Sequence, residues 1–258
     1  MLAIVMRLLG YRKETERVKK KGLRILAAAA VLTFGCLTMN AYAAEGWALS
    51  NNIWTYLDKN GNRVTNEWKK GADNLWRYLN NSGEMAVNSW ADNDYYVDAN
   101  GIMVADKWMQ IVSPYSRDSQ TYWFYFGSSG KVTKDTWKKI DGKSYYFDTD
   151  GIMQTGWTED GDYYLSSSGA MVTGWKYLEP KDEDSSLYGP ESDDGKYWFY
   201  FSASGKKQSP STSDDGGEYK VTKIDGKYYC FDADGRMRTG WVYLEGDPEN
   251  SSKSSIAD

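Results

Sequence analysis

Short aromatic and apolar runs alternate along the chain with polar turns, and the same run recurs many times. Each run ends shortly before a glycine in a polar stretch, as in "SYYFDTDG". Positions are counted from this turn glycine below. Side chains in a strand alternate between two faces, so positions −7 and −5 share one face while −6 and −4 share the other. Each run is therefore predicted to be a short strand with aromatic character on both faces. The turn glycines are Gly61, Gly83, Gly101, Gly130, Gly151, Gly169, Gly205 and Gly235.

Several positions before the glycine are nearly fixed in residue type. Position −5 is tyrosine in seven of the eight units, with Cys230 as the exception, and position −4 is apolar in all of them. A similar unit recurring about every 20 residues is typical of a repeat array. Position −7 differs, because it is Trp54, Trp76, Trp123 or Trp198 in four units and Asp94, Ser144, Asp162 or Tyr228 in the others.

Beyond the glycine, methionine is common at +2 and tryptophan closes the unit at +6 or +7. The Asp, Asn and Gly residues of the turn tolerate positive φ, as hairpin turns require. We therefore predict that each unit is one β-hairpin that turns at its glycine, with a second strand ending at the tryptophan. Units with the longer spacing are predicted to absorb the extra residue in a bulge or a loosened strand end. The closing tryptophans are Trp68, Trp90, Trp108, Trp137, Trp157, Trp175 and Trp241.

The unit length also predicts how the hairpins associate. A unit of about 20 residues has no room for a crossover helix, and an isolated hairpin is marginal in water, so the hairpins must stack. The predicted fold class is all-β, a solenoid or superhelix of stacked β-hairpin repeats over residues 44–241. Surface insertions are expected near 109–122, 179–196 and 206–218, and a polar tail over 242–258.

The first 43 residues are predicted to be a secretory signal peptide cleaved after Ala43, because a basic stretch, a short apolar stretch and a small-residue ending follow one another. A lipoprotein site at Cys36 is the less favoured alternative. The segment holds eight basic and two acidic residues, so its removal changes the net charge from −5 to about −11. An acidic exported chain is unsuited to binding nucleic acid, and no later run is long enough to span a membrane. The mature chain is expected to be held on the cell envelope noncovalently.

The residue types argue against catalysis. The chain has no histidine, and Cys230, the one cysteine of the mature chain, lies among aromatic residues in a predicted strand. Nucleophilic catalysis needs a partner base, and a glycosidase needs two carboxylates at a fixed separation. The acidic run at 182–186 lacks the spaced ligands of a calcium loop. No enzyme activity, cofactor or metal is expected.

The repeats resemble a known family. The segments "GWALSNNIWTYLDKNG", "NLWRYLNNSGEMAVNSW", "GDYYLSSSGAMVTGW" and "DGKYYCFDADGRMRTGW" resemble the cell-wall-binding repeats, of the choline-binding type, in Gram-positive surface proteins. They are also similar to the glucan-binding repeats of streptococcal glucosyltransferases and to the carbohydrate-binding repeats of clostridial toxins. The resemblance covers roughly residues 46–241.

The resemblance implies a β-hairpin solenoid with choline pockets between consecutive hairpins. In such a pocket the tryptophan that ends one repeat, the tryptophan at −7 of the next strand and an aromatic residue of the following hairpin surround the quaternary ammonium. Carried over to this chain, the −5 tyrosine serves as the third wall. The complete sets are then Trp47, Trp54 and Tyr78; Trp68, Trp76 and Tyr96; and Trp108, Trp123 and Tyr146. The other sets are incomplete, because Asp94, Ser144 and Asp162 replace the −7 tryptophan and Cys230 replaces a −5 tyrosine.

The predicted function is noncovalent attachment to a repetitive cell-wall polymer, by recognition of choline on teichoic acid. Ring faces attract a quaternary ammonium, and repeated weak sites gain avidity on a polymer with many identical groups. Ligand contacts are expected to concentrate between residues 47 and 146. Two alternatives remain open: binding of glucan or another glycan through the same rings, and a purely structural surface stalk. The sequence makes no prediction of the oligomeric state.

Overall fold

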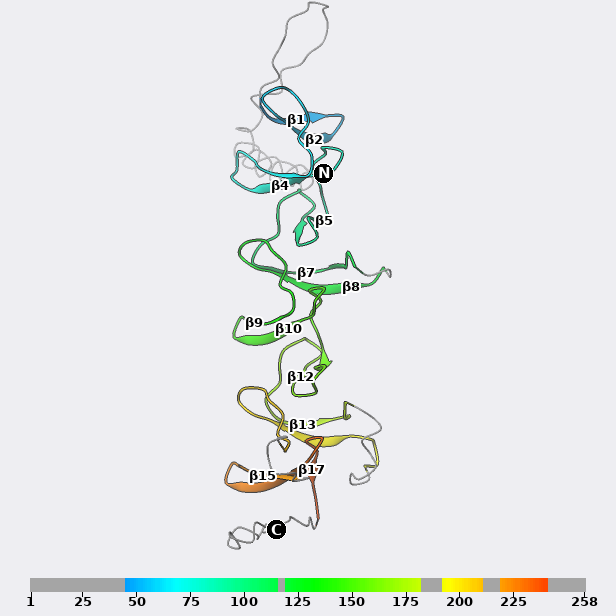
Figure 1. The fold of residues 1–258 in the computed structure, drawn as a ribbon, viewed down its shortest axis with the longest axis vertical. Coiled ribbons are helices and arrows are strands. Elements are labelled where there is room, and N and C mark those ends of the chain that lie inside the picture. Colours follow the sequence, from blue (N-terminus) through cyan, green and yellow to red (C-terminus); the bar gives the residue numbers. More distant parts are fainter. Residues whose placement is uncertain (1–44, 116–118, 182–191, 211–218, 241–258) are drawn as a thin grey trace, which may run out of the picture. The chain divides into compact units, whose positions relative to one another are not determined.

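The computed structural model describes residues 45–115, 119–181, 192–210 and 219–240. The predicted signal peptide, the polar tail and Trp241 lie outside these residues. The described chain consists of short strands and turns (Figure 1), which confirms the all-β class with repeated hairpins. The strands are β1 (Gly46–Ser50), β2 (Ile53–Leu57), β3 (Glu67–Lys70), β4 (Trp76–Leu79), β5 (Ser89–Ala91), β6 (Tyr95–Val97), β7 (Lys107–Val112), β8 (Thr121–Phe126), β9 (Thr136–Ile140), β10 (Lys143–Phe147), β11 (Gly156–Trp157), β12 (Tyr164–Leu165), β13 (Gly174–Leu178), β14 (Tyr197–Phe201), β15 (Tyr219–Ile224), β16 (Lys227–Asp232) and β17 (Met237–Arg238).

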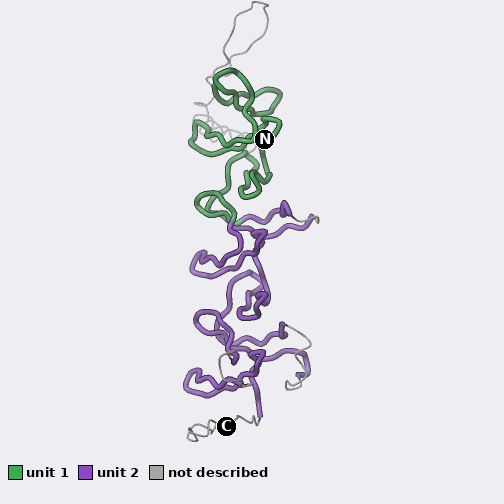
Figure 2. The backbone as a smooth tube through the Cα atoms, in the orientation of Figure 1, with its two compact units in different colours: residues 1–108, 126–132 green, residues 109–125, 133–258 purple. Residues whose placement is uncertain are grey.

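The chain divides into two compact units, coloured separately in Figure 2. The first comprises residues 1–108 and 126–132, and the second residues 109–125 and 133–258. The first unit contains the sheets β1–β2, β3–β4 and β5–β6, and the second contains β9–β10, β11–β12, β13–β14 and the three-stranded β15–β16–β17. The division passes through the sheet formed by β7 and β8. Among the described residues, none belongs to a helix of the length and apolar character that crossing a membrane requires.

The predicted pairing of the strands is wrong. The main hairpins join the tryptophan strand that closes one repeat to the tyrosine strand of the next, so that Trp68 faces Tyr78 and Trp137 faces Tyr146. Around the turn glycine most repeats make one bridge between positions −4 and +2, as between Leu79 and Met85. Only β16 and β17 form a short two-residue ladder there within the described chain.

The physical reason for this pairing lies at position +5. The residue there has positive φ in both spacing groups, for example 50° at Asn66 and 78° at Gly156. Such a residue turns the chain away from the strand it has just bridged. The Asn66 amide then donates a hydrogen bond to the Asn80 carbonyl of the next repeat (3.2 Å). The extra residue of the longer units lies between this left-handed residue and the tryptophan, which still faces a tyrosine: Trp68 faces Tyr78 as Trp157 faces Tyr164.

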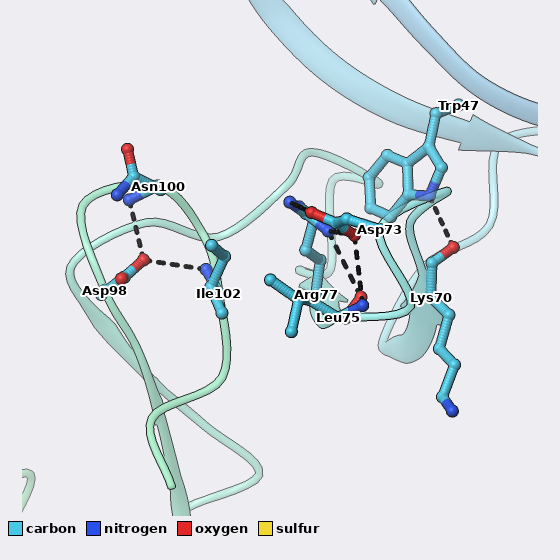
Figure 3. A network of polar contacts seen from close by, with 8 residues as sticks. All are labelled: Trp47, Lys70, Asp73, Leu75, Arg77, Asp98, Asn100 and Ile102. Carbon is cyan, nitrogen blue, oxygen red and sulfur yellow. Dashed lines mark hydrogen bonds and ion pairs between the residues drawn. The ribbon is translucent and has the colours of Figure 1, made fainter. Parts of the chain in front are cut away.

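The turns themselves are closed by the residue at −3. The Asp98 carboxylate accepts the amides of Asn100 (2.8 Å) and Ile102 (2.9 Å), as Figure 3 shows. The Gly101 amide donates to the Asp98 carbonyl at 2.9 Å. Asp58, Asn80, Asp148 and Asp232 make the same pair of side-chain contacts in their repeats. The Asp/Asn-Gly stretches of the sequence are therefore turns, as predicted.

Consecutive repeats within each unit are joined by one recurring backbone hydrogen bond. The amide at +2 donates to the carbonyl at −7 of the preceding repeat, as from Met103 to Trp76 (2.9 Å) and from Met171 to Ser144 (2.8 Å). The +2 methionine lies against the next turn glycine: a Cβ on Gly130 would stand 2.6 Å from Met103 Sδ. The −4 side chains form the core, and the following are at most 1% exposed: Leu79, Val97, Phe126, Phe147, Leu165, Phe201 and Phe231.

Candidate aromatic ligand sites

Ring clusters lie where one hairpin packs on the next. The indole of Trp68 stands 5.1 Å, centroid to centroid, from the Tyr78 ring of its own hairpin and 5.5 Å from Tyr95 of the following hairpin. Trp137 repeats this arrangement with Tyr146 (5.3 Å) and Tyr163 (5.0 Å). Tilted and edge-on rings at these separations attract one another in addition to burying area.

The ring from the following hairpin comes from position −6, which the sequence interpretation missed. Tyr95 and Tyr163 occupy it, as do Phe199, 5.0 Å from Trp157, and Tyr229, 4.7 Å from Trp175. The signal was present, since −6 shares a face with the buried −4 residue and is aromatic in six of the eight repeats. The −5 tyrosine, which served as the third wall, instead faces the tryptophan of its own hairpin.

The first predicted set is not joined by ring contacts. Trp47 contacts Tyr56 at 5.5 Å, and its indole nitrogen donates to the Lys70 carbonyl at 3.0 Å. Trp54 is half-buried on β2, and Tyr78 lies against Trp68. The joint role of Trp47, Trp54 and Tyr78 in holding a ligand stays a prediction.

The second and third predicted sets have similar outcomes. In the second, Trp68 contacts Tyr95 rather than Tyr96, whose ring lies 5.7 Å from Trp90. The residues of the third, Trp108 on β7, Trp123 on β8 and Tyr146 on β10, are divided between the two units, with Trp108 in the first. Both sets stay predictions as ligand sites.

The tryptophans at −7 are exposed. Trp76 is 41% exposed, Trp123 43% and Trp198 44%. The backbone carbonyl at this position makes the joint between repeats, whereas the side chain is not needed there. These three rings therefore do not fill the core, and position −7 accommodates Trp, Asp or Ser without a change of fold.

Where −7 is aspartate, its carboxylate already has a cationic partner. Asp94 pairs with Lys131 and Asp162 with Lys206, each at 3.0 Å. The lysine stands at +1 of the following repeat in both cases. Half-exposed pairs of this kind contribute at most about 1 kcal/mol.

The loop of the β3–β4 hairpin holds Trp76 next to a lysine. Arg77 grips the Asp73 carboxylate through two nitrogens, at 2.9 and 2.7 Å, and this hydrogen bonding lowers the Asp73 pKa to about 2. Figure 3 shows this pair beside the Trp47 hydrogen bond to Lys70. The Lys70 ammonium lies 4.9 Å from the centroid of the Trp76 ring. An exposed tryptophan face of this repeat thus carries a cation.

One carboxylate orients the Trp68 cluster. Asp92, in the β5–β6 turn, accepts the Trp68 indole N–H at 2.9 Å and the Tyr78 hydroxyl at 2.8 Å. Burial, followed by the hydrogen bond to Asp92, raises the pKa of Tyr78 to about 12. The sequence contains no clear signal for this clamp, because Asp92 belongs to a turn whose partner strand was misassigned.

A further cluster of rings surrounds Trp175. Its ring lies 5.0 Å from Tyr200, 4.7 Å from Tyr229 and 6.4 Å from Trp198. The sequence interpretation took this set as incomplete because Cys230 occupies −5, but Tyr229 at −6 supplies the ring from the following hairpin. Cys230 is buried, and burial raises its pKa.

The described residues hold no group of three or more acidic, cysteine or histidine side chains arranged for a metal ion. The acidic run at 182–186 lies outside them.

Two stretches of the chain, residues 44–90 and 132–174, match the sequence model of the choline-binding repeat. These two stretches of the chain are similar to the choline-binding repeat. The first stretch contains Trp68 and Tyr78 but ends before Tyr95, whereas the second contains Trp137, Tyr146 and Tyr163.

Solved structures of similar fold come from Streptococcus pneumoniae. Choline binding protein F, solved in the presence of a peptidoglycan analogue, is 29% identical over 74% of this chain and 57% of its own, with a TM-score of 0.50. The modular autolysin LytC is 24% identical over 75% and 46%, with a TM-score of 0.44. The choline-binding domain of CbpL is 23% identical over 77% and 99%, with a TM-score of 0.28. The chain thus spans about half the length of the first two. A comparison with curated protein sequences found no match.

Proposed function

We propose that this choline-binding repeat chain attaches noncovalently to a cell-wall polymer and recognises choline on teichoic acid. The observation that carries the proposal is Trp76, an exposed ring in a matched repeat, with an ammonium group 4.9 Å from its centroid. A quaternary ammonium cannot donate hydrogen bonds, so ring faces are its best partners, each contributing about 0.5–2 kcal/mol. One such site binds weakly, whereas several on a repetitive polymer gain avidity by roughly 10²–10⁴.

The proposed ligand residues are the three predicted sets together with the Trp175 cluster. The tryptophans at −7 are the proposed outer walls, and the tryptophans that close the repeats are the proposed inner walls. Trp175, Trp198 and Tyr229 add a candidate beyond residue 146, so binding extends further along the chain than the sequence pattern suggested. The predicted residues retained here are Trp47, Trp54, Tyr78, Trp68, Trp76, Tyr96, Trp108, Trp123 and Tyr146.

The chain acts as a binding module and not as an enzyme, and it needs no cofactor or metal. It is exported by the segment 1–43 and resides at the cell surface. Support comes from the two stretches that match the choline-binding repeat and from the similarity to choline binding protein F, which was solved in the presence of a peptidoglycan analogue.

A glycan is the second candidate ligand, favoured by one pair of side chains. Tyr177 and Trp198 face each other across β13 and β14, both 44% exposed, with centroids 5.3 Å apart and planes inclined by 40°. Adjacent exposed rings of this kind can stack on a sugar face.

Affinity chromatography separates the candidates. The full mature chain is passed over a tertiary-amine resin and, in parallel, over a dextran column, with free choline as eluent. Retention on the amine resin and release by choline support the proposal. Retention on dextran alone would assign the chain to glycan binding, and passage through both columns would favour a structural stalk.

A further inference from the structure

A pocket of about 250 Å³ lies within the second unit, beside Trp157. Its walls include Trp157, Asp162 at −7 of the next strand, Phe199 at −6 of the following hairpin, and Lys207. These are the positions whose counterparts elsewhere are the inner wall, the outer wall and the third ring. The pocket therefore lies at the ligand position of a repeat whose outer tryptophan is replaced by aspartate.

Lys207 stands at +2, where five other repeats have methionine: Met85, Met103, Met153, Met171 and Met237. Its amide makes the usual joint to the Asp162 carbonyl at 2.8 Å. Its aliphatic stem also takes the place of the methionine, because a Cβ on Gly235 would stand 2.8 Å from Lys207 Cδ. The backbone and aliphatic stem of Lys207 thus make the same contacts as the methionine of other repeats, and Lys207 differs from that methionine in its terminal charge.

That charge lies 5.3 Å from the centroid of the Trp157 ring. The neighbouring acids are engaged elsewhere: Asp162 pairs with Lys206 at 3.0 Å, and Asp234 with Arg236 at 3.4 Å. Within the described part of the chain, the Lys207 ammonium makes no ion pair of its own. The face of the Trp157 ring stabilises this charge. Burial of the ammonium lowers the pKa of Lys207.

We propose that Lys207 is a tethered cation that occupies the Trp157 site and closes it to quaternary ammonium ligands. The inference rests on the proposed choline function, because it concerns which repeats bind that ligand. A second cation at the same ring face would meet like-charge repulsion in a partly buried site, where screening by salt is weak. This repeat therefore packs like the others but does not bind the quaternary ammonium ligand.

A comparison with Lys70 explains why Lys207 competes more strongly with a ligand cation for its tryptophan ring. Lys70 is exposed at the end of β3, so its ammonium can leave the Trp76 ring for water. Lys207 is half-buried and its stem is held under Gly235, so its charge stays at the ring.

The test compares the wild-type full chain with Lys207→Met, the residue found at this position in other repeats. Choline chloride is titrated into each protein by calorimetry, and tryptophan fluorescence is followed in parallel. We expect Lys207→Met to bind one more choline per chain. Lys227→Met removes the same charge from an exposed position in the same unit and should leave the stoichiometry unchanged.

Two further variants keep the result decisive. Lys207→Gln keeps a polar stem without the charge and should also gain the site, whereas Lys207→Arg should remain closed. Thermal unfolding verifies that each variant is folded. If folded neutral variants bind no more choline than wild type, the proposal is overturned, while choline binding by the wild type itself would leave the proposed function standing. Absence of binding in the wild type and all variants would overturn both.

Discussion

At the scale of single residues, charges and polar tips decide how the rings are held. The Asp92 carboxylate joins Trp68 and Tyr78, and the Lys207 ammonium covers Trp157. Neither contact follows from the sequence pattern, since each depends on which turn or strand lies opposite a ring. The sequence did predict that the side chains at −5 and −4 lie on opposite faces of a strand, because side chains alternate between faces along a strand.

Replacing Asp92 by alanine is expected to lower the free energy of unfolding by roughly 1–3 kcal/mol, because two ring donors lose their acceptor. Asp141→Ala is the matched control. Asp141 occupies the corresponding turn of β9–β10 with φ of 48°, against 51° at Asp92. Denaturant unfolding measures both, and equal losses would mean that the turn conformation, not the clamp, accounts for the effect.

The raised pKa of Tyr78 leads to a prediction about stability at alkaline pH. Its pKa is raised to about 12, so its contribution to stability is fully present below about 10 and is lost as the pH rises toward 12. Spectrophotometric titration of the phenols should show one late-ionising tyrosine that is missing in Tyr78→Phe. An unchanged titration curve in that variant would contradict the assignment.

Lys207 has the opposite dependence. Burial lowers its pKa, with Asp234, Asp162 and Asp232 acting against this effect and Lys181 adding to it. Between the lowered pKa and the ordinary value of 10.5, the unfolded chain binds the proton more readily, so rising pH stabilises the fold. The free energy of unfolding of wild type minus that of Lys207→Met should therefore increase with pH across this window. A difference that is flat with pH would show that Lys207 is not desolvated.

At the scale of elements, the chain alternates between two kinds of turn: the turn at the glycine of each repeat and the turn of the hairpin that joins consecutive repeats. The sequence predicted strands, turns and stacking correctly, because alternation and Asp/Asn-Gly stretches are local signals. It predicted the wrong strand partner, because two adjacent strands with aromatic faces can pair on either side of a turn. The left-handed residue at +5, such as Asn66 or Asn88, decides the matter, and a single asparagine is a weak signal when polar residues are common in the turns.

The turn glycines offer a test of the contact between repeats. Gly130→Ala should be more destabilising than Gly142→Ala by about 1–3 kcal/mol, the usual range for overpacking. Both glycines have φ of 80°, but a Cβ on Gly130 would overlap Met103, whereas one on Gly142 meets nothing within 4 Å. Thermal or denaturant unfolding of the two variants gives the difference. Equal destabilisation would mean that Met103 moves aside without loss.

At the scale of the whole molecule, the number of proposed ligand sites is smaller than the number of repeats. Exposed −7 rings occur at Trp76, Trp123 and Trp198, whereas Asp94 and Asp162 are paired with lysines. The sequence predicted such unevenness from position −7. It did not predict the contribution of −6, since the third ring depends on how one hairpin packs on the next.

Trp76→Ala and Trp198→Ala should each weaken retention on a choline-bearing surface while leaving the fold intact. Losing one ring contact of about 0.5–2 kcal/mol corresponds to a local affinity loss of roughly 2- to 30-fold. Ser144→Ala changes the same repeat position where no ring is present and should have little effect. Surface plasmon resonance on immobilised choline measures all three, and retention unaffected by both tryptophan variants would exclude these rings as ligand walls.

The backbone joint from +2 to −7 has a consequence for how such a protein changes over generations. Since main-chain atoms make this joint, a substitution at −7 alters what the surface can hold without disturbing the neighbouring repeat. Selection can therefore adjust the strength of attachment in small increments, gaining or silencing one position at a time. Substitutions at −7 can therefore change which surface polymer the protein binds while every variant remains folded.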